Sequence, residues 1–149
     1  MPKITALIHA QNNARCIGRA LESLRPCDEF VVVDHNSSDG TAQIARQYGA
    51  VVASPEGVLT SIGHDWVLLL QPYEAISESL ESTLYAWKQE DPGAQAFAVR
   101  IRKETPEGWQ IQPAEARLRR RSSLPSSSPE TAAVDVPLLE GDLLRFIES

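Results

Sequence analysis

The sequence predicts an α/β fold: a mostly parallel sheet with helices on both faces and a small antiparallel extension. The first observation is a series of short, wholly apolar runs, which is typical of strands covered on both faces. The second is that segments with apolar residues at helical spacing separate these runs, which favours parallel strands joined by right-handed crossovers. The third is a change after residue 95, where apolar and charged residues alternate as in a half-exposed strand.

Four strands are predicted in the first half of the chain. They are residues 4–8, 30–33, 50–53 and 66–70. The residues expected to cap the first two helices are Asn12 or Asn13, and Ser38 or Asp39. Gly49 is placed to end the second helix in the left-handed conformation. Ser77 is expected to begin a third helix, with Leu80, Leu84 and Trp87 facing the core.

Weaker patterns mark the second half. Residues 95–102 predict a half-exposed strand, residues 106–108 a turn, and residues 109–112 the returning strand of a hairpin. Residues 116–121 are typical of a further edge strand. The apolar spacing within 138–146 indicates a short amphipathic helix.

Length and composition exclude several classes of protein. A chain of 149 residues is most simply one domain. The net charge of −6 argues against nucleic-acid binding, which needs a basic surface. No apolar run is long enough to span a membrane, and the N-terminus lacks a signal-peptide core. Cys16 and Cys27 fit no zinc spacing and no Cys-x-x-Cys motif, so reduced thiols and a cytoplasmic location are expected.

Residues 31–41, Val-Val-Val-Asp-His-Asn-Ser-Ser-Asp-Gly-Thr, are the most informative segment. They predict a strand that ends in a carboxylate, a polar turn and the start of a helix, which is how open α/β sheets build ligand sites. The segment resembles the Asp-x-x-Ser-x-Asp-Gly-Thr signature of family-2 glycosyltransferases. Other segments resemble the same family in the same order, most of all its bacterial lipopolysaccharide-core glucosyltransferase type. They are residues 17–24, 44–50, 65–70 and 117–120.

The resemblance implies the GT-A fold, a nucleotide-sugar donor and sugar transfer with inversion. It implies one truncated GT-A-like domain (1–149), with a nucleotide-binding half (1–90) and a compressed acceptor-side half (91–149). The implied nucleotide-binding residues are Ala10, Gln11, Asn12, Asp34, Ser37 and Asp39. The catalytic residues stay unknown, because neither Glu115 nor Asp135 lies in a recognisable motif.

Two of these residues have a second interpretation. Asp34 either bonds the uracil or ribose of a nucleotide, or forms a turn by bonding its own loop amides. Asp39 is either a ligand group or the cap of the second helix.

The sequence departs from the family where its members hold magnesium or manganese. In place of an Asp-x-Asp motif it has Gln71-Pro72-Tyr73, which offers one neutral amide oxygen and a neutral phenol. Glu74 is retained, either as a metal ligand or as a capping or salt-bridging residue. Residues 54–62 are too short for the helix that faces the donor phosphates in the family, plus its connections. We therefore expect no metal cofactor and weak or no transferase activity.

Alternatives remain for the basic cluster and for the whole chain. Arg117, Arg119 and Arg121 alternate on one strand face, where guanidinium groups could bind a diphosphate in place of a metal and support an active transferase. A solvated edge strand is the other interpretation of this cluster, Arg117–Arg121.

The chain could also be a non-enzymatic protein-interaction module, as a homodimer or with another protein. His9, Asp34 and His35 could form a metal site of imidazole and carboxylate groups.

Overall fold

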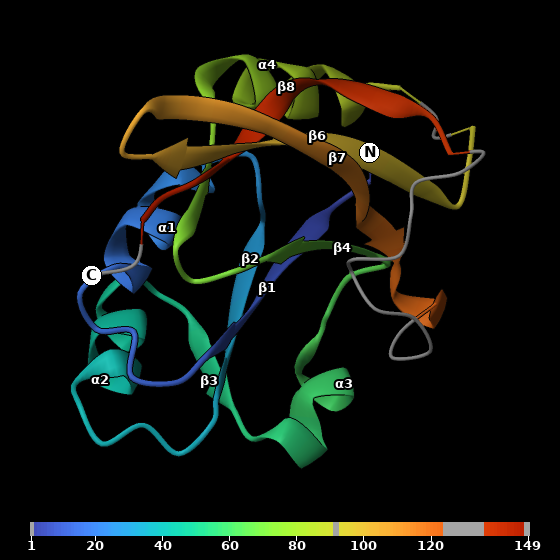
Figure 1. The fold of residues 1–149 in the computed structure, drawn as a ribbon. Helices are drawn as coiled ribbons and strands as arrows, with labels where there is room; N and C mark the ends of the chain where they lie inside the picture. The colour runs from blue at the N-terminus through green and yellow to red at the C-terminus, as the bar shows by residue number, and fades with distance from the viewer. Residues whose placement is uncertain (1, 91–92, 124–135, 148–149) are drawn as a thin grey trace.

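The computed structural model describes residues 2–90, 93–123 and 136–147. Within these ranges eight strands form one sheet in the order β3-β2-β1-β4-β7-β6-β8-β5 (Figure 1). The strands are β1 (Ile4–Ala10), β2 (Glu29–Asp34), β3 (Val51–Ala53), β4 (Trp66–Leu70), β5 (Glu74–Ile76), β6 (Ala96–Thr105), β7 (Gly108–Arg120) and β8 (Leu138–Arg145). The helices are α1 (Ile17–Ser23), α2 (Thr41–Gln47), α3 (Val58–Ser61) and α4 (Glu78–Trp87), with 3₁₀ turns η1 (Pro55–Gly57) and η2 (Arg121–Ser123).

The first four strands are parallel neighbours, as predicted. Leu7 of β1 pairs with Val31 of β2 on one side and with Leu69 of β4 on the other, and β3 pairs with β2. The four strands therefore end at one edge of the sheet, which we call the carboxyl edge. Their last residues are Ala10, Asp34, Ala53 and Leu70.

The second half of the sheet is largely antiparallel. β6 and β7 form the predicted hairpin, in which Thr105 pairs with Gly108. The prediction of an edge strand at residues 116–121 is wrong, because β7 lies between β4 and β6 and pairs with both. The side chains of this part of β7 therefore meet neighbouring strands on both sides.

Helices cover both faces of the sheet, as predicted, but unequally. The larger core joins α1, α2 and α4 to one face of β1, through Ile4, Ala6 and Ile8. The smaller core lies on the other face, where Val58 and Leu59 of α3 pack near Leu7. Because successive strand residues point to opposite faces, one apolar run supplies both cores.

The predicted helix over residues 138–146 is wrong: this segment forms β8. It pairs in parallel with β6 and antiparallel with β5. The apolar spacing of Leu138, Leu139, Leu143 and Leu144 is compatible with either structure. Gly141 has a φ of +103°, which a right-handed helix does not allow. The pairing partners on both sides decide for the strand.

Two of the predicted helix caps are wrong and one is confirmed. The N-cap residue of α1 is Cys16 and that of α2 is Gly40. In neither helix does an N-cap side chain form a hydrogen bond to the first turn. Ser77 caps α4 as predicted, since its Oγ accepts a hydrogen bond from the Leu80 N–H (3.1 Å). Gly49 has the expected left-handed conformation, with a φ of +83°.

Residues 54–62 form more regular structure than expected. A 3₁₀ turn, η1, leads directly into the single helical turn of α3. The segment is thus long enough for a short helix, although not for a long one. None of the helices in the described ranges is both long and apolar enough to cross a membrane.

Candidate functional site

Two adjoining hollows lie along the carboxyl edge. The first, of about 470 Å³, is above Asp34 and extends over the residues that follow β3. The second, of about 300 Å³, lies between the ends of β1 and β4. His35 lines both hollows, so they adjoin at the end of β2. Their lining residues are His9, Ala10, Gln11, Asn13, Asp34, His35, Asn36, Ser54, Pro55, Glu56, Gln71, Pro72 and Tyr73.

The loops after β1 and β2 are joined by hydrogen bonds around Asp34. Oδ1 of Asp34 accepts from both the backbone N–H and the hydroxyl of Ser37. Ser37 Oγ in turn accepts from the Asn12 N–H (2.9 Å), and Asn12 Oδ1 accepts from the Ser38 N–H (2.8 Å). The turn-forming role of Asp34 is therefore present. Its Oδ2 has no donor within the described part of the chain, so one carboxylate oxygen remains available to a ligand.

Asp39 forms a second connection between the same loops. Its Oδ1 accepts from the N–H (3.0 Å) and hydroxyl of Thr41, and its Oδ2 accepts from the Ala14 N–H (3.2 Å). The hydrogen bond from the Thr41 hydroxyl is the main reason that the pKa of Asp39 is lowered. Thr41 also accepts from the Asn13 N–H (2.9 Å). Asp39 thus holds the loops in place beside the carboxyl edge and does not line either hollow there.

His9 and His35 face each other across the ends of β1 and β2. His9 Nδ1 lies 2.8 Å from His35 Nε2, so one ring donates to the other. Partial removal from water, and secondarily the neighbouring His35, lower the pKa of His9. Within the described ranges no group of three or more His, Cys, Asp or Glu is arranged to hold a metal. The His-Asp-His metal site that the sequence left open as an alternative is therefore not found among the described residues, where the two imidazoles bond each other.

We expect a titration by NMR to place the pKa of His9 below the ordinary histidine value. His35→Gln should raise it partway, because the neighbouring charge is lost while partial burial remains. The folded chain disfavours protonation of His9, so neutral His9 contributes to the free energy of unfolding. This contribution is complete above the ordinary histidine pKa and is lost as pH falls through the lower pKa of the folded state. His64→Gln, far from this edge, is the control. An unchanged pKa of His9 in His35→Gln would contradict the coupling.

The Gln71-Pro72-Tyr73 turn lies at the edge of the second hollow, opposite the histidine pair. Gln71 and Tyr73 occupy the positions where the resemblance places metal ligands. The amide and the phenol bear no charge at neutral pH, and hard divalent cations favour carboxylates. These residues do not fit a magnesium or manganese site.

Glu74 does not compensate for the missing carboxylates, because it is buried. Its two oxygens accept from Arg117 at 2.7 and 3.1 Å, and from Arg145 Nε at 2.9 Å. Oε1 also accepts from the Gln71 N–H (2.8 Å), which fixes the turn. Burial alone would raise the pKa of Glu74, but Arg117 and these hydrogen bonds outweigh it and lower the pKa. The salt-bridging interpretation of Glu74 is confirmed.

The expected place of Arg117 on a solvated strand face is wrong. Its side chain is 1% exposed, and every guanidinium nitrogen bonds Glu74, Glu115 or the Leu69 carbonyl. The three partners leave no free face of the guanidinium for a phosphate. A buried carboxylate makes this burial possible, since an unpaired guanidinium would be costly there.

The rest of the basic cluster lies at the wrong end of the sheet for a diphosphate at the carboxyl edge. β7 runs antiparallel to β4, and Arg119 pairs with Val67 and Arg120 with Trp66, at the beginning of β4. Arg121 donates its N–H to the Asp65 carbonyl (2.7 Å). The structure thus gives no support to arginines 117–121 replacing a metal. Asp135, the other carboxylate considered, lies outside the described residues.

Some lining residues were not nominated from the sequence. Ser54, Pro55 and Glu56 line the first hollow directly after β3. Ligands in such sheets lie beyond the carboxyl ends of parallel strands, and β3 is one of these strands. The sequence after β3 could therefore have been used to predict these three lining residues. Arg15 and Arg19 line a separate hollow, and no motif in the sequence distinguishes them.

The curated proteins that are similar in sequence to this chain include glycosyltransferases. Over 96 residues the chain is 35% identical to an uncharacterized glycosyltransferase of Rickettsia felis, which covers 56% of this chain and 33% of that protein. Over 50 residues it is 40% identical to the lipopolysaccharide core biosynthesis glycosyltransferase LpsC of Rhizobium meliloti, covering 32% of this chain and 18% of LpsC. The match to the Rickettsia protein thus spans about a third of that relative's length. No family model matches the chain.

Comparison with solved structures decides the fold. S. aureus TarS 1-349, solved with UDP-GlcNAc, superposes with a TM-score of 0.74 over 99% of this chain and 59% of TarS, at 16% identity. The fold is the GT-A fold of glycosyltransferases. Glucosyl-3-phosphoglycerate synthase from Mycobacterium tuberculosis, solved with Mn²⁺, UDP and phosphoglyceric acid, gives 0.60 over 83% of this chain and 57% of the synthase, at 19% identity.

Proposed function

We propose that this GT-A domain binds the nucleotide part of a nucleotide sugar at its carboxyl edge. The observation that carries the proposal is the free Oδ2 of Asp34 beneath a hollow of about 470 Å³, in a turn held rigidly by Ser37 and Asn12. A carboxylate in this position accepts hydrogen bonds from the N–H of a base or from ribose hydroxyls. The UDP and UDP-sugar complexes of TarS and the mycobacterial synthase support the choice of a uridine nucleotide.

By descent the reaction is transfer of a sugar with inversion, and we propose that it is weak or lost here. A transferase must offset the negative charge that develops on a departing nucleoside diphosphate, and a bound metal contributes several kcal/mol to this. The turn at Gln71 and Tyr73 supplies no carboxylate for such a metal, and Glu74, the carboxylate that follows this turn, is neutralised by two arginines. Recognition of base and ribose needs no metal, so binding survives where turnover does not.

Asp34→Ala is expected to lower the affinity for both uridine and UDP by about tenfold or more, because a hydrogen bond to a charged group contributes about 1.5–3 kcal/mol. The measurement is ligand titration by NMR. Asp34→Asn keeps an acceptor for Ser37 but loses the charge, so it separates ligand binding from turn formation. Asp65→Ala, an exposed aspartate before β4, is the matched control.

Three results would count against this proposal. Equal binding by wild type and Asp34→Ala places the ligand elsewhere. No spectral change at millimolar uridine or UDP favours the protein-interaction module. An affinity for a UDP-sugar that rises tenfold on adding Mn²⁺, against our expectation of no change, shows that other residues hold the metal.

A further inference from the structure

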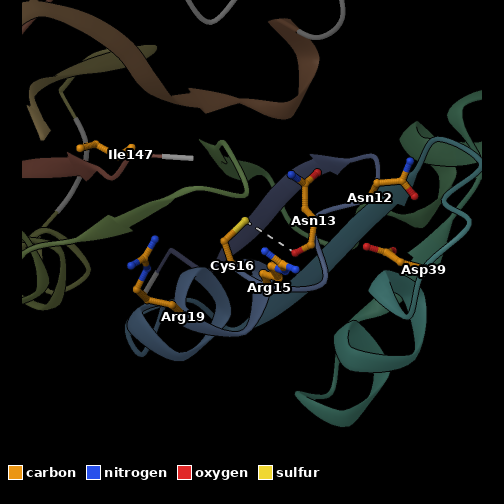
Figure 2. Close-up of a pocket in the computed structure, with 7 residues that line it drawn as sticks. All are labelled: Asn12, Asn13, Arg15, Cys16, Arg19, Asp39 and Ile147. Atoms are coloured by element: carbon orange, nitrogen blue, oxygen red, sulfur yellow. Dashed lines mark hydrogen bonds between the residues drawn. The ribbon is translucent and has the colours of Figure 1, made fainter. Parts of the chain in front are cut away.

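A third hollow, of about 360 Å³, lies beside α1 and next to the carboxyl edge (Figure 2). The loop after β1, the start of α2 and the end of the described chain after β8 surround it. Its lining residues are Asn12, Asn13, Arg15, Cys16, Arg19, Asp39 and Ile147. Asn13 also lines the hollow at the ends of β1 and β4, so the two hollows are neighbours.

The hollow holds the guanidinium groups of Arg15 and Arg19, and no carboxylate of the described residues pairs with either. Within the described ranges neither Arg15 nor Arg19 forms an ion pair or donates a hydrogen bond to the protein. Elsewhere in the described ranges, ion pairs are formed by several arginines, among them Arg25, Arg100, Arg102, Arg117, Arg120 and Arg145. The chain as a whole carries 20 acidic against 14 basic residues, so a hollow lined by two arginines and one aspartate has the opposite sign of charge.

Arg19 is held in place without using its donors. Its guanidinium carbon lies 3.6 Å from the centre of the Phe146 ring, and Phe146 is held in turn by an edge-to-face contact with Trp109. A cation–π contact orients the planar group through its face. The N–H donors around its rim therefore remain available to an anion.

The two asparagines add neutral donors to the hollow. Asn12 Oδ1 accepts from the Ser38 N–H (2.8 Å), and Asn13 Oδ1 accepts from the Gln11 N–H (2.7 Å). These bonds identify which side-chain atom of each asparagine is the oxygen. In the described ranges both NH₂ groups then have no protein acceptor. The one carboxylate, Asp39, already accepts from Thr41 and Ala14. Among the lining residues that the structure describes, two guanidinium groups and one carboxylate sum to a charge of +1.

We propose that this hollow binds a phosphoryl group, with Arg15 and Arg19 as the charged donors and Asn12 and Asn13 as neutral ones. Guanidinium groups match the geometry of phosphate oxygens, and charge-assisted hydrogen bonds are stronger than neutral ones. Because Asn13 borders both hollows, the phosphoryl group belongs either to a nucleotide bound at the carboxyl edge or to a separate phosphorylated molecule. The first source rests on the proposed function and the second does not.

The test titrates the full chain with inorganic phosphate while the arginine Nε–H signals are followed by NMR. Wild type should bind saturably, with shifts at Arg15 and Arg19. Arg15→Gln/Arg19→Gln should weaken binding about tenfold or more, and Arg15→Gln alone should weaken it less while leaving the Arg19–Phe146 contact intact. Arg46→Gln, which removes an exposed arginine of α2, is the control for overall charge. Absence of saturable binding, or equal binding by the double variant, overturns the proposal.

Titration with UDP and uridine distinguishes the two sources. If the double variant loses affinity for UDP but not for uridine, the phosphoryl group is that of the nucleotide. If UDP binding is unchanged while inorganic phosphate binding is lost, a separate phosphorylated molecule is the ligand. If neither uridine nor UDP binds wild type, the proposed function fails. The titration with inorganic phosphate still shows whether the hollow of Arg15 and Arg19 binds a phosphoryl group.

Discussion

Glu74→Gln is expected to lower the free energy of unfolding by about 3–5 kcal/mol, because breaking a buried ion pair leaves an uncompensated charge. Glu74 is fully buried and is the partner of both Arg117 and Arg145. A neutral amide leaves the buried Arg117 with one carboxylate, Glu115. Urea unfolding followed by tryptophan fluorescence measures the loss, which is a large share of the total stability of a domain of this size.

Glu115→Gln is the matched control for this result. Glu115 also bonds Arg117 (2.7 Å) but its side chain is 15% exposed, so water replaces part of the lost interaction. We expect less than half of the loss seen for Glu74→Gln. Adding Arg117→Met to Glu74→Gln should recover part of the stability, since the unpaired charge is then removed. Equal losses in the two glutamine variants would show that Glu74 has no special role.

The ion pair also predicts a dependence on pH. The folded state holds the pKa of Glu74 below its ordinary value, so the unfolded chain takes up this proton first as the solution is acidified. The stabilisation is therefore complete above the ordinary glutamate pKa and is lost as pH falls through the lower, folded value. The stability difference between wild type and Glu74→Gln should shrink over that range.

Gly141→Ala is expected to cost roughly 2–6 kcal/mol, the sum of backbone strain and overpacking. Gly141 lies in β8 with a φ of +103°, which disfavours any side chain. A Cβ there would lie 2.4 Å from the Leu80 nitrogen and 2.6 Å from its Cα, at the start of α4. Ser77 bonds both Leu80 and Asp142 at this junction, so α4 cannot move away without breaking those bonds.

Gly108→Ala separates strain from crowding. Gly108 has a φ of +120°, but no heavy atom lies within 4 Å of the position of an added Cβ. It should cost about 1–3 kcal/mol from strain alone. Thermal and urea unfolding of both variants gives the difference. If the two variants lose equal stability, the contact between β8 and α4 is softer than the structure indicates.

The sequence by itself determined the parallel half of the fold and the position of its carboxyl edge. Unbroken short apolar runs such as residues 30–33 are typical of strands covered on both faces, and the residues directly after parallel strands lie at one edge. The placement of Asp34 and Ser37 at this edge was therefore predicted from local order alone, and their part in ligand binding stays a prediction. Ser77 was found in the same way, because a cap acts on residues three positions away.

The tertiary structure alone decided the roles that depend on distant partners. Arg117 and Glu74 are 43 residues apart, and nothing near either one in the sequence reveals that each neutralises the other. Residues 138–146 form a strand because β6 and β5 offer hydrogen bonds on both sides, which outweighs a spacing that also suits a helix. The hollow of Arg15 and Arg19 exists because three chain segments meet there. Local propensity fixes elements where the pattern is strong, whereas charge burial and strand pairing follow from contacts that only folding creates.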